Sequence, residues 1–165
     1  MAPIEVRVLR TFVPREVRDC MCGRLLAKYR RGDRSASDVA DAVAALESQN
    51  LLPESDALLL SAVHAVSPVP TVLWTRACAR IPRLSTFKLR GLLAIARESP
   101  RCRKHLPASL VLSRNGAMAA LHEASSHRSA WSMDLLERAV QHLKTGELEP
   151  SGDRDQITRW PRTVI

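Results

Sequence analysis

A helical pattern with a clear start and a clear end covers residues 85–100 and constrains the fold of the chain. Ser85 is in position to cap the first turn, and Ser99-Pro100 closes the run. Between them, apolar side chains stand at helical spacing: Leu89, Leu92, Leu93 and Ala96. The stretch is therefore predicted to be one amphipathic helix of about three turns.

The same pattern returns 32 positions earlier, which indicates a repeated unit. In that copy, the places of Leu92, Ala94, Ile95, Ser99 and Pro100 are taken by Leu60, Ala62, Val63, Ser67 and Pro68. A fainter third copy lies 26 positions later, at Met118, Ala120, Leu121 and Ser125. Because the predicted helices around these copies alternate in pairs, each copy is expected to be the second helix of a helical hairpin.

Caps and prolines divide the rest of the chain into further predicted helices. These cover residues 14–31, 38–49, 53–66, 70–81, 117–124 and 130–144, with a less regular stretch over 101–115 and a turn at Asn115-Gly116. Aromatic residues make up only 4% of the chain, so the core must come mainly from Leu, Val and Ala, which suits packed helices. The sequence thus predicts an all-α fold of stacked antiparallel helical hairpins, similar to a short α-solenoid. The alternative is an irregular helical bundle.

The helical-hairpin domain is expected to span residues 14–145, with an arm at each end. Residues 1–13 alternate around Ile4-Glu5-Val6-Arg7-Val8, which fits an extended arm, a short edge strand or the remainder of a targeting peptide. Residues 146–165 are polar and proline-containing, and we expect an extended tail there. Two tryptophans, Trp131 and Trp160, are expected to contact neighbouring proteins.

The charge of the chain points to a polyanionic partner, either RNA or an anionic membrane face. The net charge is +8, and residues 67–128 contain eleven Lys and Arg against two Asp and Glu. Residues 35–66, by contrast, contain five acids and no Lys or Arg. A GC-rich coding bias can account for the preference for Arg over Lys, but it does not explain the scarcity of acids in residues 67–128.

Nine cations of this basic segment are the candidate RNA-binding residues: Arg76, Arg80, Arg83, Lys88, Arg90, Arg97, Arg101, Arg103 and Lys104. The first three stand at i, i+4 and i+7, which would place them on one helix face. Together the nine could present one cationic surface across adjacent hairpins and contact phosphates without reading bases. The alternative is a solvated charged face. Because the chain has few aromatic residues, base stacking is not expected.

No motif in the chain predicts catalysis, a cofactor or a metal site. Gly-rich phosphate loops, nucleophile elbows and paired carboxylates are missing, and a small-molecule substrate is not expected. His122 and His127 are five residues apart, which leaves them about 140° apart around a helix and unsuited to sharing a zinc ion. Four cysteines without a secretory signal predict reduced thiols. No apolar run is long enough for membrane insertion.

The helical repeats resemble a known class of proteins. The apolar runs at Leu92–Ala96 and Leu60–Val63, with Trp74 early in the preceding helix, look like the degenerate helical-hairpin repeats of organellar RNA-binding proteins, of the tetratricopeptide, pentatricopeptide and octotricopeptide kinds. The likeness covers residues 37–145. It implies residence in the mitochondrial matrix and a non-catalytic role in a ribonucleoprotein, such as a mitochondrial ribosomal protein that contacts rRNA and neighbouring subunits.

A second interpretation assumes the same fold but no contact with RNA. In it, the chain is a protein-protein interaction scaffold or a supernumerary subunit of another mitochondrial complex. The two interpretations differ in what the cations of residues 67–128 do, and therefore in where the structure places them.

Overall fold

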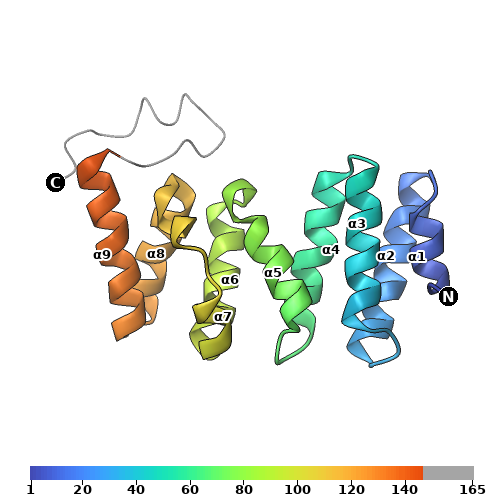
Figure 1. Cartoon of the computed structure of the whole chain (residues 1–165), viewed down its shortest axis with the longest axis horizontal. Helices are drawn as coiled ribbons and strands as arrows, with labels where there is room; N and C mark the ends of the chain where they lie inside the picture. The colour runs from blue at the N-terminus through green and yellow to red at the C-terminus, as the bar shows by residue number, and fades with distance from the viewer. Residues whose placement is uncertain (147–165) are drawn as a thin grey trace. The chain divides into compact units, whose positions relative to one another are not determined.

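The computed structural model describes residues 1–146, and the regular elements in this range are all helical (Figure 1). The predicted all-α class is confirmed. The chain divides into two compact units, Met1–Ala77 and Cys78–Ile165, which we call the N-terminal and C-terminal units. The predicted tail over residues 146–165 lies outside the described residues, except for Gly146.

The N-terminal unit holds four helices and most of a fifth: α1 (Ile4–Leu9), α2 (Arg15–Arg30), α3 (Ala36–Ser48), α4 (Leu52–Ala65) and α5 (Thr71–Ala79). Helix α1 packs on α2 and α3, and α4 packs on α2 and α3. The core of this unit is aliphatic, with side chains such as Leu9, Leu25, Leu46 and Leu59 fully buried. Removing these side chains from water is the main stabilising contribution to the unit.

Two antiparallel hairpins, α1–α2 and α3–α4, lie in the same direction within this unit. At one end, Arg34 Nε before α3 lies 3.3 Å from Glu5 Oε2 in α1, and at the other end Gln49 donates a hydrogen bond to the Leu9 carbonyl. Helices α1 and α3 are therefore parallel. The N-terminal turns of α2 and α4 also meet, since Arg18 and Glu54 form an ion pair of 4.0 Å. A continuous solenoid through both units stays a prediction.

The expectation of an extended arm over residues 1–13 is wrong for the part that forms α1. Val6 and Leu9 are fully buried, three residues apart as on one helix face. Glu5 is buried as well, and its carboxylate is paired with Lys28 and Arg34. The alternating pattern of residues 4–8 fits a strand locally, but these long-range contacts favour the helix.

The C-terminal unit contains η1 (Ile81–Arg83), α6 (Thr86–Glu98), α7 (Pro100–Lys104), η2 (Ala108–Leu112), α8 (Arg114–Ser126) and α9 (Ala130–Thr145). Helix α8 packs on α6, η2 and α9 (Figure 1). Asn115 at the start of α8 donates to the Leu84 carbonyl just before α6, at 3.3 Å. Arg97 and Glu123 pair near the other ends of the same helices. Helices α6 and α8 are therefore parallel.

Serine side chains cap the starts of α3, α6, α7, α8 and α9, and the cap at Ser85 was predicted. Ser85 accepts a hydrogen bond from the Lys88 amide, and Ser35 with Asp38 forms a reciprocal capping box. The predicted turn at Asn115-Gly116 is wrong, because Ser113 caps α8 and draws both residues into its first turn. Helix α9 ends as predicted at Gly146, whose φ of 72° suits a glycine.

Candidate nucleic-acid interface

Almost all of the net charge of the protein belongs to the C-terminal unit. Residues 78–146 contain twelve Lys and Arg against four Asp and Glu, a net charge of +8. Residues 1–77 contain ten Lys and Arg against nine Asp and Glu, a net charge of +1. A polyanion would therefore be attracted mainly to the C-terminal unit.

The first three predicted cations do not share one helix. Helix α5 ends at Ala79, Arg80 follows it, and Arg83 lies in the separate turn η1. Arg76 belongs to the N-terminal unit, whereas Arg80 and Arg83 belong to the C-terminal unit. Arg80 is half-buried, and burial, with a smaller effect of the Arg83 charge, lowers its pKa below the ordinary value. The predicted i, i+4, i+7 row on one helix is therefore wrong.

Helix α6 presents its cations on two flanks. Lys88 and Arg90 are both exposed, but two residues turn a helix by about 200°, so they project to opposite sides. The buried stripe of α6, which includes Leu89 and Leu93, lies between them. The two side chains can contact separate segments of a phosphate backbone, but they do not form one continuous cationic surface on this helix.

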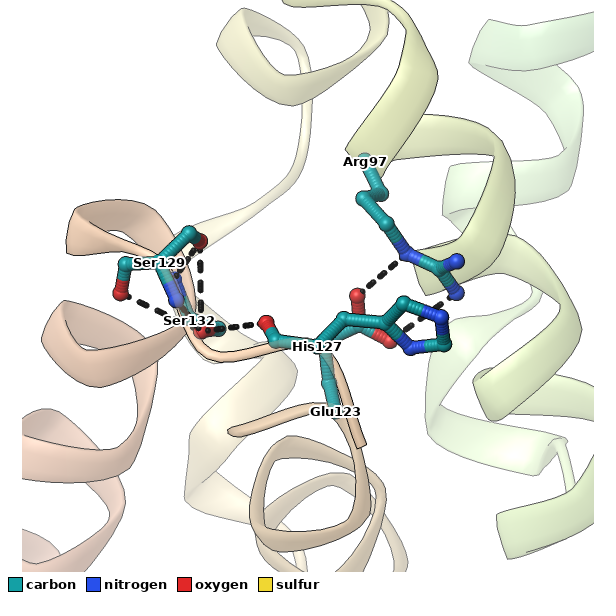
Figure 2. A network of polar contacts seen from close by, with 5 residues as sticks. All are labelled: Arg97, Glu123, His127, Ser129 and Ser132. Atoms are coloured by element: carbon teal, nitrogen blue, oxygen red, sulfur yellow. Dashed lines mark hydrogen bonds and ion pairs between the residues drawn. The ribbon is translucent and has the colours of Figure 1, made fainter. Parts of the chain in front are cut away.

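Arg97 is engaged by its own chain. Its guanidinium forms two contacts with the Glu123 carboxylate, Nε to Oε1 at 2.7 Å and Nη2 to Oε2 at 3.4 Å (Figure 2). The Glu123 side chain is only 5% exposed, so this ion pair is largely shielded from water. Arg97 therefore joins α6 to α8, and we leave it out of the candidate interface.

The turn after α8 continues this polar network. The His127 amide donates to the Glu123 carbonyl at 2.8 Å, and Ser132 Oγ donates to the His127 carbonyl at 2.9 Å (Figure 2). Ser129 and Ser132 also cap each other's backbone amides at the start of α9. These contacts join α6 to α8 and α8 to α9.

Helix α7 carries Arg101, Arg103 and Lys104. Arg101 and Lys104 are exposed, whereas the Arg103 guanidinium lies 5.8 Å from the centroid of the Trp131 ring. This distance fits a cation-π contact. Trp131, predicted as a contact for a neighbouring protein, thus packs at least partly within its own chain. Trp160, the other predicted contact, lies outside the described residues.

Five exposed cations of the C-terminal unit form no ion pair with a carboxylate of residues 1–146: Lys88, Arg90, Lys104, Arg128 and Lys144. We call them the available cations. Arg128, in the turn between α8 and α9, was missed by the sequence analysis. Its signal was the lack of any acid within four residues on either side.

The N-terminal unit has a hollow of about 360 Å³ between α2 and α4. Leu26 and Leu58 line it together with Cys22, and the exposed ion pair of Arg15 and Asp19 lies at its rim. Burial, aided by the Asp19 charge, raises the pKa of Cys22 to about 11. The thiol is therefore protonated at neutral pH and a poor nucleophile.

Within residues 1–146, no three His, Cys, Asp or Glu side chains come together in a way that could hold a metal ion. None of the helices between Ile4 and Thr145 is both long enough and apolar enough to cross a lipid bilayer. Comparison of the chain with protein-family models, curated proteins and solved structures gave no match.

Proposed function

We propose that this protein is a non-catalytic helical subunit of a ribonucleoprotein and binds structured RNA through its C-terminal unit. The observation that carries the proposal is the net charge of +8 over residues 78–146, together with the five available cations. Exposed cations without carboxylate partners retain their full charge for phosphates and release counterions when they bind.

The placement of the cations favours contact with the RNA backbone. Lys88 and Arg90 project from opposite flanks of α6, so one helix can reach two phosphate segments, as it would on either side of an RNA groove. Such contacts position a protein on folded RNA and carry little sequence information. The parallel α6 and α8, joined at both ends, provide a rigid support for them.

The resemblance of residues 37–145 to organellar helical-hairpin proteins extends the proposal to a place in the cell. The protein would reside in the mitochondrial matrix as a mitochondrial ribosomal protein, with its C-terminal unit on rRNA. The N-terminal unit, with a net charge of only +1, would contact neighbouring protein subunits.

The binding test compares two triple variants of the full chain. One replaces Lys88, Arg90 and Arg128 by Gln, and the control replaces Arg15, Arg31 and Arg138, which form exposed ion pairs. Affinity for a structured RNA is measured from about 50 to 200 mM salt. The first variant is expected to reduce the slope of log affinity against log salt by about 2, and the control by much less. Salt-insensitive binding, or equal effects, would contradict the proposal.

The assembly test uses the tagged protein in cells of its source. Cosedimentation with an rRNA-containing particle from the mitochondrial fraction is the expected result. Cosedimentation with an RNA-free complex would favour the scaffold interpretation instead, and nuclease treatment before the gradient separates the two outcomes.

A further inference from the structure

Phe87 is the most exposed large apolar side chain in the described part of the C-terminal unit. Its exposed fraction is 81%, against 43% for Leu121 in α8 and 36% for Val140 in α9. Phenylalanine is normally among the most buried residue types, because its ring gains much from leaving water. A ring held almost completely in solvent beside two available cations has the chemistry to stack on a planar, anionic ligand.

The first turn of α6 holds Phe87 in this position. Ser85 caps the helix by accepting from the Lys88 amide at 3.3 Å. Leu84 and Leu89 flank the cap at the positions of a hydrophobic staple, and both are buried. They therefore fix, on each side of Phe87, which face of α6 is turned toward the core. With the buried stripe turned inward, Phe87 points to solvent.

The helix surface next to Phe87 carries a cation and small side chains. Arg90 and Gly91, three and four residues ahead, are its neighbours within one turn, and Ala94 follows at the next turn. Glycine and alanine have no side chain long enough to cover the ring. The aromatic face thus stays open, with the available cation Arg90 about 60° around the helix and Lys88 on the other flank.

We propose that Phe87 stacks on an unpaired base of the bound RNA while Arg90 and Lys88 contact the flanking phosphates. This inference rests on the proposed function and names the RNA feature that the site would take: a bulge or loop beside a helix. Stacking on an aromatic ring tolerates any base, because every base has a π face. One exposed ring is enough for such a contact, even though aromatic residues are few.

A protein partner is less well supported by the surroundings of Phe87. Protein interfaces use contiguous apolar patches whose centres are depleted of charge. On α6, Phe87 stands alone between Lys88 and Arg90, and its outward face continues through Ala94 to Glu98. An isolated ring among cations matches a base and its phosphates better than it matches an apolar protein surface.

The experiment uses the full chain, two RNAs and two substitutions. The RNAs are a blunt-ended, fully paired duplex and the same duplex with one bulged 2-aminopurine. Phe87→Leu removes the ring but keeps an apolar side chain, and Phe87→Tyr keeps the ring. Since Phe87 is exposed, both variants are expected to keep the unfolding midpoint of the wild type.

Phe87→Leu is expected to weaken binding to the bulged RNA by about 5- to 100-fold, with the salt slope unchanged. Binding to the fully paired duplex should change little. Binding of the wild type and of Phe87→Tyr should quench the 2-aminopurine fluorescence, and Phe87→Leu should not.

Each of the following results would overturn the inference. An equal loss on both RNAs, or no loss on either, would mean that Phe87 does not stack on the bulge. Normal RNA binding by Phe87→Leu with loss of a copurifying protein would assign the ring to a protein interface. A wild type that binds neither RNA would overturn the proposed function as well, whereas salt-dependent binding unaffected by Phe87→Leu would overturn the stacking alone.

Discussion

The backbone of Gly116 passes so close to Leu110 that a Cβ atom on Gly116 would lie 1.6 Å from the Leu110 carbonyl oxygen. Gly116 is in the first turn of α8, and Leu110 belongs to η2. The Gly116 amide also donates to the capping Ser113 hydroxyl at 3.0 Å, which holds the backbone in this position. Only a residue without a side chain permits this contact between η2 and α8.

Replacing Gly116 by Ala is therefore expected to lower the free energy of unfolding by about 2 kcal/mol or more, because backbone has to move to relieve the clash. The matched control is Gly23→Ala in α2, where an added Cβ meets nothing within 4 Å. There, alanine is expected to raise the stability by about 0.5–1 kcal/mol. Urea unfolding followed by circular dichroism measures both changes, and a stable Gly116→Ala protein would contradict the close packing.

The buried carboxylate of Glu5 is expected to make the stability depend on pH at low pH. Burial raises the pKa of Glu5, but the hydrogen bonds from Lys28 and Arg34, with a backbone hydrogen bond, outweigh it and hold the pKa at about 2 instead of 4.5. A pKa lowered by folding contributes stability above pH 4.5 that is lost as the pH falls toward 2. The loss for this single group is roughly 3 kcal/mol.

Glu5→Gln tests this contribution. At pH 7 the variant is expected to be less stable than the wild type by roughly 3 kcal/mol, and the difference should shrink between pH 4.5 and 2 as the wild type loses its charge. Glu16→Gln, at an exposed position of α2, serves as the control and should change the stability by less than about 0.5 kcal/mol. A difference between Glu5→Gln and wild type that is constant with pH would contradict the ion-pair assignment.

Arg97 and Arg90, on the same helix, are expected to behave in opposite ways. Arg97→Gln leaves the buried Glu123 carboxylate without its partner and should cost about 2–3 kcal/mol of stability. Arg90→Gln should leave stability unchanged but reduce the salt slope of RNA binding by about 0.7–0.9. Thermal unfolding and RNA titrations on the two variants give the comparison, and a stable Arg97→Gln that loses RNA affinity would restore Arg97 to the interface.

The four cysteines are expected to differ strongly in reactivity. Cys20 is exposed, whereas Cys102 is 1% exposed. Burial raises the pKa of both Cys22 and Cys78 to about 11, so little thiolate is present at neutral pH. Native protein at pH 7.5 should therefore react with maleimide first at Cys20, at least about tenfold faster than elsewhere. Peptide mass spectrometry after a short pulse identifies the site, and early labelling of Cys102 would contradict its burial.

Part of the candidate interface could be predicted from the sequence and part could not. Counting charges placed the excess of cations in residues 67–128, and Lys88, Arg90 and Lys104 of that segment are exposed. It could not show that Arg97 is paired, because Glu123 lies 26 residues further along the chain. It counted Phe87 only among the few aromatic residues of the chain, whereas the structure shows an exposed ring.

The sequence by itself determined the helical class and most helix limits, because caps such as Ser35, Ser85 and Gly146 act within one turn of the backbone. Only the tertiary structure decided the helix at residues 4–9, the need for glycine at Gly116 and the internal role of Arg97. Each of these depends on a contact that local pattern does not encode: the Glu5 ion pairs, the Leu110 carbonyl and the Glu123 carboxylate. Local hydrogen bonding thus sets where helices begin and end, while packing and burial set which charges remain for a partner.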